Sequence, residues 1–204
     1  MNNSGQKILI YGCGGHARSV AGVLIDKIPS VNIIFVDRNA KDNEKIFNFP
    51  VVKEYNKDLP YHIAIGDNEK RKNLNRTLNK TNLVSIISDR ALVDKTVNIK
   101  KGCFIAHLAY MAPLCSIGTG TIINTRATIE HEVKIGEFCH IAPSTTICGR
   151  SSIGDNVIIG AGATVIDYIE ICSDVIIGAG AVVTKDITES GVYVGTPVRK
   201  INKN

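Results

Sequence analysis

A six-residue repeat is the feature that most constrains the fold of this chain. An aliphatic side chain, or Met once, returns at every sixth position: Val93, Ile99, Ile105, Met111, Ile117, Ile123, Ile129, Ile135, Ile141, Ile147, Ile153, Ile159, Val165, Ile171, Ile177 and Val183. A period of six fits neither the 3.6 of a helix nor the 2 of a simple strand. It is typical of a parallel β-helix, in which three units make one triangular coil and the repeated side chains stack along its axis.

Two further positions of the repeat support a β-helix. Two residues before the aliphatic, the side chain is often small or β-branched, as a second inward-facing position requires: Thr121, Ala127, Val133, Thr145, Val157, Ala163, Val175 and Ala181. The residue after the aliphatic is often Gly, as at Gly118, Gly136, Gly154, Gly160 and Gly178. We expect tight turns at these glycines, because Gly tolerates unusual φ and ψ. Chance periodicity in a chain that is 44% hydrophobic is a poor alternative, since no unit misses its apolar residue.

The residues before the repeat have the pattern of a small α/β unit. An apolar run at 7–11 ends in Gly12-Cys13-Gly14-Gly15-His16 and precedes a helix-compatible stretch at 17–27. Apolar runs at 33–36, 61–65 and 83–87, with a polar helix at 69–79, complete a small parallel sheet, and Pro50 and Pro60 mark connections. We therefore predict a Rossmann-like half domain over 1–88. A β-helix domain over 89–204 follows, which the chain leaves at 189–197, where the Gly195-Thr196-Pro197 turn caps the last coil.

The glycine turn indicates a phosphate-containing ligand. The spacing Gly12-x-Gly14-x-x-Ala17 approximates a dinucleotide fingerprint, in which the backbone approaches phosphate at a helix N-terminus. Asp37 ends the next apolar run, where such folds use an acid to bind ribose hydroxyls. A tight turn without ligand is the alternative. Half of a dinucleotide fold suits a mononucleotide or a nucleotide sugar better than a whole NAD.

One unit of the repeat is chemically unusual: Ile129-Glu130-His131-Glu132-Val133, followed nine residues later by His140. His131 falls at a corner of the coil, where a base with a pKa near 6.5 can accept a proton at neutral pH. Glu130 or Glu132 could orient its second nitrogen. A solvated corner histidine is the alternative. Nine residues is half a coil, so His131 and His140 could share one site only across a subunit interface.

Composition argues against several classes of protein. The net charge of +5 comes without a long basic block, and there is no Trp, so we expect no nucleic-acid partner. The six cysteines lack zinc-ligand spacing, so we expect free thiols and no metal. Cys139 beside His140 could suggest a nucleophile pair, but no third group orients it. No long apolar run and no leader pattern at 1–6 are present, so we expect a cytoplasmic protein without a membrane partner.

The repeat resembles that of the left-handed parallel β-helix acyltransferases. The whole chain, from KILIYGCGGHARSV through NTRATIEHEVKIGEFCHIAP to GVYVGTPVRK, resembles the bacterial nucleotide-sugar N-acetyltransferases. These include the UDP-4-amino-sugar and bacillosamine-pathway enzymes, and they are related to the sialic acid O-acetyltransferases. The most specific part of the resemblance is the I-E-H-E unit followed by the F-C-H triplet.

The resemblance implies a homotrimer that binds acetyl-CoA between adjacent β-helices and uses no metal. His131 would take a proton from the sugar amine, and Glu132 would raise its basicity. His140 would contact the thioester end of acetyl-CoA, and the backbone near Ala161 and Ala179 would line the pantetheine groove. The nucleotide sugar would be held by Gly14, Gly15, His16, Asp37, Gly66 and Asn68. Arg38 stands where a second acid often follows the first in these enzymes, which leaves the nucleotide base open.

The leading hypothesis is acetyl transfer from acetyl-CoA to the 4-amino group of a nucleotide-linked 4-amino-4,6-dideoxy sugar, with a UDP-linked sugar of the bacillosamine type favoured. A second hypothesis moves the acetyl group to a hydroxyl of sialic acid or a related sugar, which is the harder nucleophile to deprotonate. A third is a non-catalytic trimeric nucleotide-sugar-binding protein, in which the β-helix serves assembly only. An NAD-dependent enzyme rests on the Gly12 turn alone.

Overall fold

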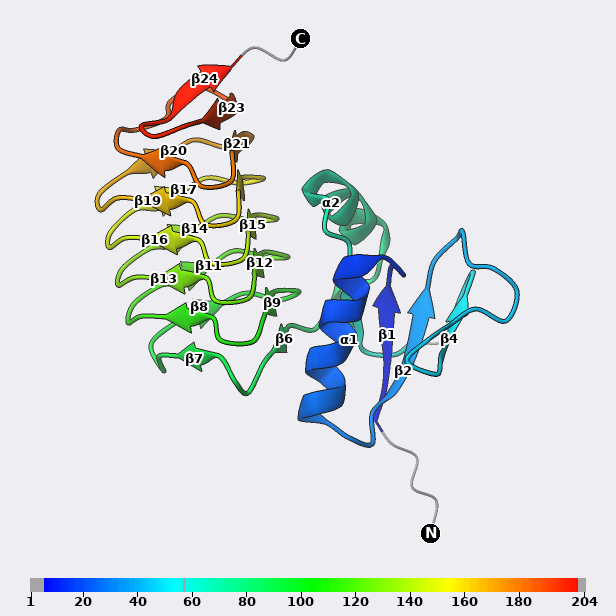
Figure 1. Ribbon diagram of the computed structural model, residues 1–204. Coiled ribbons are helices and arrows are strands. Elements are labelled where there is room, and N and C mark those ends of the chain that lie inside the picture. The colour runs from blue at the N-terminus through cyan, green and yellow to red at the C-terminus, as the bar shows by residue number, and fades with distance from the viewer. Residues whose placement is uncertain (1–5, 57, 202–204) are drawn as a thin grey trace.

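The computed structural model describes residues 6–56 and 58–201, and it has two parts that lie side by side (Figure 1). A small α/β module comes first, and a column of stacked triangular coils follows. The fold class expected from the repeat, a parallel β-helix after a Rossmann-like half domain, is confirmed. The prediction of no leader falls almost wholly on residues 1–5, which lie outside the described residues. Within the described part of the chain, no helix is long and apolar enough to cross a membrane.

The α/β module is a five-stranded sheet in the order β3-β4-β2-β1-β5 with two helices. Its elements are β1 (Lys7–Tyr11), α1 (Gly15–Lys27), β2 (Asn32–Val36), β3 (Lys45–Ile46), β4 (Phe49–Val52), β5 (Tyr61–Ile63), α2 (Asn68–Thr77) and the short 3₁₀ helix η1 (Lys80–Asn82). β1 pairs in parallel with both β2 and β5, which lie on its two sides, so the order in which strands are added to the sheet reverses at β1. Ligands of open α/β sheets bind outside the carboxyl ends of strands at such a switch point.

Two predictions for the edges of this sheet are wrong. The run at 83–87 does not complete it, because only an isolated bridge joins Leu83 to Tyr61, and Ile86 pairs with the first coil instead. The outer strands are the β3–β4 hairpin, in which Pro50 belongs to β4 and is not a connection. Pro50 fits there because β4 pairs with β2 only through Val51 and Val52, at the edge of the parallel ladder. The boundary proposed at residue 88 stays a prediction.

Three sheets form the β-helix, and each of the first five coils gives one strand to every sheet; the strands run parallel except for β24. The module-facing sheet contains β6 (Ile86–Ile87), β9 (Phe104–Ile105), β12 (Ile122–Ile123), β15 (His140–Ile141), β18 (Ile158–Ile159), β21 (Val175–Ile177), β23 (Gly191–Val194) and β24 (Arg199–Ile201). The second sheet contains β7 (Leu92–Val93), β10 (Tyr110–Met111), β13 (Thr128–Ile129), β16 (Thr146–Ile147), β19 (Thr164–Val165) and β22 (Val182–Val183). The third sheet contains β8 (Asn98–Ile99), β11 (Ser116–Ile117), β14 (Lys134–Ile135), β17 (Ser152–Ile153) and β20 (Glu170–Ile171).

The predicted core positions are confirmed. From Ile105 to Val183 every sixth-position side chain is at most 4% exposed, and Val93 and Ile99 are only partly buried because they lie in the first coil. All eight residues predicted at the second inward position are also buried. The strand register advances 18 residues per coil, as in the pairing of Ile123 with Ile141, so equivalent residues stack in columns.

The reason given for the repeat glycines is wrong. Positive φ occurs two residues later, at one position per unit, where the chain has Leu108, Leu114, Gly120, Arg126, Glu132, Phe138, Ser144, Arg150, Asn156, Gly162, Tyr168, Asp174 and Gly180. The predicted turn glycines are needed for close approach between coils instead. A Cβ added to Gly118 would lie 2.4 Å from the carbonyl carbon of Gly136, one coil further on.

The C-terminal end of the β-helix is capped by a hairpin. β23 still pairs in parallel with β21, so the chain leaves the module-facing sheet later than the predicted 189–197 segment. β24 then turns back to run antiparallel to β23, with Gly195-Thr196-Pro197 in the connection. The hairpin covers the last coil, which is the role that a solenoid end requires.

Candidate active site

The glycine turn lies at the carboxyl end of β1 and opens α1. Gly14 is the N-cap residue of α1 and provides no side-chain hydrogen bond to the first turn. Gly14 and Gly15 are exposed, and a Cβ on either would meet no atom within 4 Å. The unpaired amides of a first helical turn bind anions, because the helix dipole adds to their hydrogen bonds. This edge of the module can therefore accept a phosphate.

Asp37 lies at the adjacent edge, directly after β2. It is half-buried, and its Oδ1 accepts a hydrogen bond of 2.9 Å from the amide of Asn39. Burial, followed by the hydrogen bond to Asp37, raises the pKa of the Cys13 thiol to about 11. Cys13 is therefore protonated at neutral pH and unsuited to act as a nucleophile. The carboxylate of Asp37 is placed where it can accept hydrogen bonds from hydroxyl groups of a ligand.

His16 and His140 come together although they belong to different parts of the chain. Their ring centroids lie 6.3 Å apart, and His140 stands on β15 of the module-facing sheet. Burial lowers the pKa of His16 to about 3 and that of His140 to about 4. The guanidinium of Arg71 lowers the pKa of His140 further, and a hydrogen bond that the ring donates to the Gly66 backbone opposes this. Both imidazoles are neutral at pH 7.

Arg71 is the residue of this region that sequence reasoning missed. It is 1% exposed and forms no ion pair with a carboxylate of the described residues; its Nε donates to Gly120 O at 2.7 Å, and its Nη2 donates to Cys139 O at 3.0 Å. Its Nη1 donates to Ile65 O at 2.7 Å, directly before Gly66. Burial lowers the pKa of Arg71 to about 10, so the side chain keeps its charge. It joins the loop after β5 to two coils of the β-helix.

Asn68 takes part in the same junction. Its side chain is buried, Nδ2 donates to Val157 O at 3.2 Å, and Oδ1 accepts from Arg71 at 2.7 Å. Both ends of the amide are therefore occupied within the chain. The geometry gives Asn68 a role in joining α2 to the β-helix, and its predicted contact with a nucleotide sugar stays a prediction.

His131 lies at the corner between β13 and β14, as the period predicted. Half of its side chain is exposed, and its Nδ1 lies 3.0 Å from Oε2 of Glu132. The hydrogen bond to His131 lowers the pKa of Glu132, which is therefore a carboxylate at neutral pH. Because a carboxylate only accepts hydrogen bonds, the neutral ring carries its proton on Nδ1. Nε2 is left unprotonated and can accept a proton.

Ala161 and Ala179 stack at another corner, between the module-facing and second sheets. Both are exposed, and Gly180 N donates to Ala161 O at 2.8 Å across one coil. Together with Gly162 and Gly180 they form a column of small side chains. Such a surface lets an extended ligand lie close to the backbone. His131 is at a different corner of the same chain, so one chain does not place the base beside this column.

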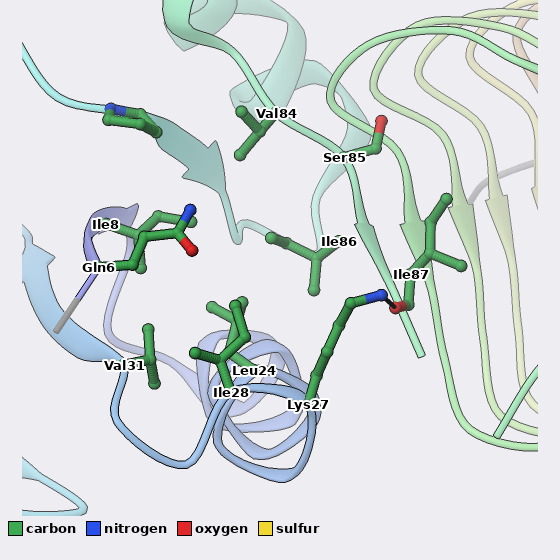
Figure 2. Close-up of a pocket in the computed structure, with 11 residues that line it drawn as sticks. Gln6, Ile8, Leu24, Lys27, Ile28, Val31, Val84, Ser85, Ile86 and Ile87 are labelled. Carbon is green, nitrogen blue, oxygen red and sulfur yellow. Dashed lines mark hydrogen bonds between the residues drawn. The ribbon is translucent and has the colours of Figure 1, made fainter. Parts of the chain in front are cut away.

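A cavity of about 270 Å³ lies at the opposite end of the module from the glycine turn (Figure 2). It is lined mainly by apolar residues, including Ile8, Leu24 and Ile86, and Lys27 crosses its edge to donate to Ile87 O at 3.1 Å. The cavity lies at the amino ends of β1 and β2, away from the predicted site residues. Across the described residues, no group of three or more His, Cys, Asp and Glu side chains could hold a metal ion.

Comparison with known proteins agrees with both parts of the fold. Residues 7–78 match the family model described as the PglD N-terminal domain, and residues 150–185 match that of the bacterial transferase hexapeptide (six repeats). No curated protein matches the sequence.

Solved structures match over nearly the whole chain. The acetyltransferase domain of PglB from Neisseria gonorrhoeae FA1090, in complex with acetyl coenzyme A, has 25% identity and a TM-score of 0.89, with 97% of this chain and 100% of that chain covered. A variant of the GDP-perosamine N-acetyl transferase from Caulobacter crescentus, in complex with CoA and GDP-perosamine, has 28% identity and a TM-score of 0.84, with 97% of each chain covered.

The fold and these matches define the class: a PglD-type α/β domain joined to a hexapeptide-repeat β-helix. The resemblance to hexapeptide-repeat sugar N-acetyltransferases, expected from the sequence, is confirmed. The solved relatives with this architecture include an acetyltransferase domain bound to acetyl coenzyme A and a nucleotide-sugar N-acetyltransferase bound to CoA.

Proposed function

We propose that this chain transfers the acetyl group of acetyl-CoA to the 4-amino group of a nucleotide-linked 4-amino-4,6-dideoxy sugar. The observation that carries the proposal is the pair formed by His131 and Glu132, in which the carboxylate holds Nδ1 and leaves Nε2 to accept a proton. The similarity to nucleotide-sugar and acetyl-CoA-binding acetyltransferases supplies the substrates.

In the proposed reaction the sugar amine attacks the carbonyl carbon of the thioester, and a C–N bond forms. Nε2 of His131 takes the proton that the amine loses, and Glu132 stabilises the resulting imidazolium. The C–S bond then breaks, and the proton on His131 passes to the departing CoA thiolate. The products are the N-acetylated sugar nucleotide and CoA. No covalent enzyme intermediate is required, which agrees with the protonated, buried thiol of Cys139.

The glycine turn, His16, Asp37 and Gly66 are the proposed contacts of the nucleotide sugar. The first-turn amides of α1 suit the diphosphate, and the carboxylate of Asp37 suits hydroxyl groups of the ligand. His140 and the column at Ala161 and Ala179 are the proposed contacts of acetyl-CoA. A UDP-linked sugar of the bacillosamine type is our first choice; the GDP-perosamine bound by one solved relative makes a GDP-linked sugar the necessary comparison.

A homotrimer is part of the proposal, because His131 and the proposed donor contacts lie on different sides of one β-helix. The second sheet is suited to contacts between copies of this chain in the trimer. Its outward residues are uncharged: Leu92, Tyr110, Thr128, Thr146, Thr164 and Val182. The third sheet instead carries Lys134 and Glu170, and α1 and α2 lie beside the part of the module-facing sheet that the earlier coils form (Figure 1). A cytoplasmic location would supply both substrates.

A thiol-release assay tests the proposal with acetyl-CoA and matched UDP- and GDP-linked 4-amino-4,6-dideoxy sugars. We expect CoA release with an amino sugar, a product heavier by one acetyl group in mass spectrometry, and loss of activity in His131→Ala. A hydroxyl analogue in place of the amine distinguishes O-acetylation. Calorimetry that detects sugar binding without acetyl-CoA binding would contradict the proposal and favour a binding protein.

A further inference from the structure

The residues one coil beyond His131 and Glu132 are in contact with them. Because the register advances 18 residues per coil, Gly149 stacks on His131 and Arg150 on Glu132. Arg150 N donates to His131 O at 2.9 Å, which fixes the spacing of the two coils at this corner. The pair Gly149-Arg150 is therefore held in register with the pair His131-Glu132 by the backbone itself.

Gly149 provides a flat surface for the imidazole. A Cβ added to it would lie 2.6 Å from Cε1 and 2.7 Å from Nε2 of His131, so the ring lies directly against its Cα. Any side chain at this position would displace the ring. The displaced atoms belong to a half-exposed side chain and not to the backbone, so the coil itself can accept the change.

Arg150 holds the carboxylate that orients the ring. Its Nε donates to Oε2 of Glu132 at 2.9 Å, and the same oxygen lies 3.0 Å from Nδ1 of His131. One oxygen therefore serves both groups. The guanidinium is fixed in turn by Tyr168 in the next coil, with its Cζ 5.4 Å from the ring centroid and its Nη1 bonded to the hydroxyl. A planar guanidinium held at both ends limits the rotation of the Glu132 carboxylate.

We propose that Gly149 and Arg150 are positioning residues for the base: Gly149 seats the imidazole of His131, and Arg150 fixes Glu132 against Nδ1. The proposal rests on the proposed function, in which His131 takes the proton of the amine.

The charges around this corner predict the direction in which the pH–rate profile shifts when Arg150 is removed. Arg150 brings a positive charge next to the His131–Glu132 pair, and Glu130 and Asp167 are the further acids of this corner, where they add to burial in raising the pKa of Cys148. A nearby cation disfavours a protonated imidazole. Removing Arg150 therefore makes protonation of the base easier, and the acid limb of the pH–rate profile moves to higher pH.

Gly149→Ala tests the seat. We expect kcat to fall about 10- to 100-fold, with the KM values of both substrates within about twofold of wild type, because a small displacement of a reacting group is costly. The urea midpoint should stay close to that of the unaltered protein. Wild-type kcat in a folded Gly149→Ala protein would overturn the role of Gly149.

Arg150→Gln tests whether Arg150 holds the Glu132 carboxylate, and it changes a side chain that is about half exposed. We expect kcat to fall about tenfold and the acid limb of the pH–rate profile to move to higher pH. In a Glu132→Gln background the same change should lower kcat little, because no carboxylate remains to be held. Lys134→Gln, which removes an equal charge from β14, is the matched control and should leave both quantities unchanged. An undiminished effect in the Glu132→Gln background would overturn the proposal.

A measurement without substrates separates this proposal from the proposed function. Nitrogen-15 NMR of the resting protein reports which ring nitrogen of His131 carries the proton. We expect the Nδ1-protonated form to dominate in wild type and to lose that dominance in Arg150→Gln and Gly149→Ala. An unchanged tautomer in both variants would overturn the proposal, whereas an active His131→Ala protein would overturn only the proposed function.

Discussion

The surroundings of His131 and His140 differ although the two residues lie nine positions apart in the same repeat. His131 is half exposed, and its Nδ1 contacts a carboxylate. His140 is largely buried, its Nε2 is occupied by the side-chain amide of Asn124 at 3.1 Å, and burial lowers its pKa to about 4. The repeat places His131 in a turn and His140 in strand β15, and their partners also differ. Of the two, His131 is the one that has both an unoccupied ring nitrogen and a counter-charge for the imidazolium, which is why we propose His131 as the base.

The largest expected effect is the difference in activity between the alanine variants of the two histidines. His131→Ala should lower kcat about 10²- to 10⁴-fold, the usual contribution of a general base. His140→Ala should act mainly on acetyl-CoA, with KM raised about tenfold, the effect of one lost polar contact. Steady-state kinetics with both substrates varied would check this. The comparison fails if His140→Ala proves the more damaging in kcat.

The next effect concerns the junction that surrounds His140. Arg71→Met should lower the free energy of unfolding by about 3 kcal/mol or more, because the carbonyls of Gly120 and Cys139 lose a buried donor. Arg76→Met is the matched control, since Arg76 is exposed and, among residues 6–56 and 58–201, its side chain bonds only to Asn73 of the same helix. Urea denaturation of both variants is the measurement. Equal midpoints for the two would show that Arg71 does not hold the parts together.

Acid should destabilise the side of the molecule that contains His140. Burial lowers the folded-state pKa values of His16, His62 and His140 to about 3, 4 and 4. The unfolded chain therefore binds more protons below about pH 6.5, so stability is complete above that pH and falls as the pH drops toward 4.

The expected loss is on the order of 1 to 3 kcal/mol for each of these histidines. Urea midpoints at several pH values between about 7.5 and 4.5 would measure it. His140→Asn should flatten the slope by about a third, because one of three titrating groups is removed. A slope unaltered by this change would mean that His140 is not neutral in the folded state.

The smallest expected effect comes from a substitution that makes the surroundings of His140 resemble those of His131. Asn124→Asp places a carboxylate beside His140 Nε2, as Glu132 stands beside His131, so the pKa of His140 should rise from about 4 by about one unit or more. NMR titration of the ring would show the shift. Asn124→Ala, which removes the contact without adding a charge, is the control and should give a much smaller change.

The period predicted what depends on the backbone of the β-helix. It placed the core, and it placed His131 at a corner, because strand pairing fixes both. It could not predict Arg71, since a polar helix read alone gives no sign that one of its cations turns inward to bind coil carbonyls. Arg150 carries a signal that could have found it: it lies one coil beyond Glu132. The pairing of the two still depends on side-chain directions, which the period leaves free.

The segments 33–36 and 83–87 show a second limit. Both are short apolar runs, and both read as strands of one sheet. The first pairs with β1, whereas Ile86 bonds to Cys103 in the first coil. Apolar character predicted a strand in each case, but the partner is chosen by the tertiary contacts available, which one sequence does not reveal.

The stacking of residues in columns restricts how this protein can change in length. Loss of 18 residues within the β-helix would remove one coil. Every later side chain would stay on the same face of the β-helix, shifted by one coil along its axis. Loss of six would instead turn every later coil by one face. The surface that carries Lys134 and Glu170 would then continue along the second sheet, and the surface of the second sheet would continue along the side where the α/β module docks. Whole coils are thus the unit in which such an enzyme can be lengthened or shortened while its site survives.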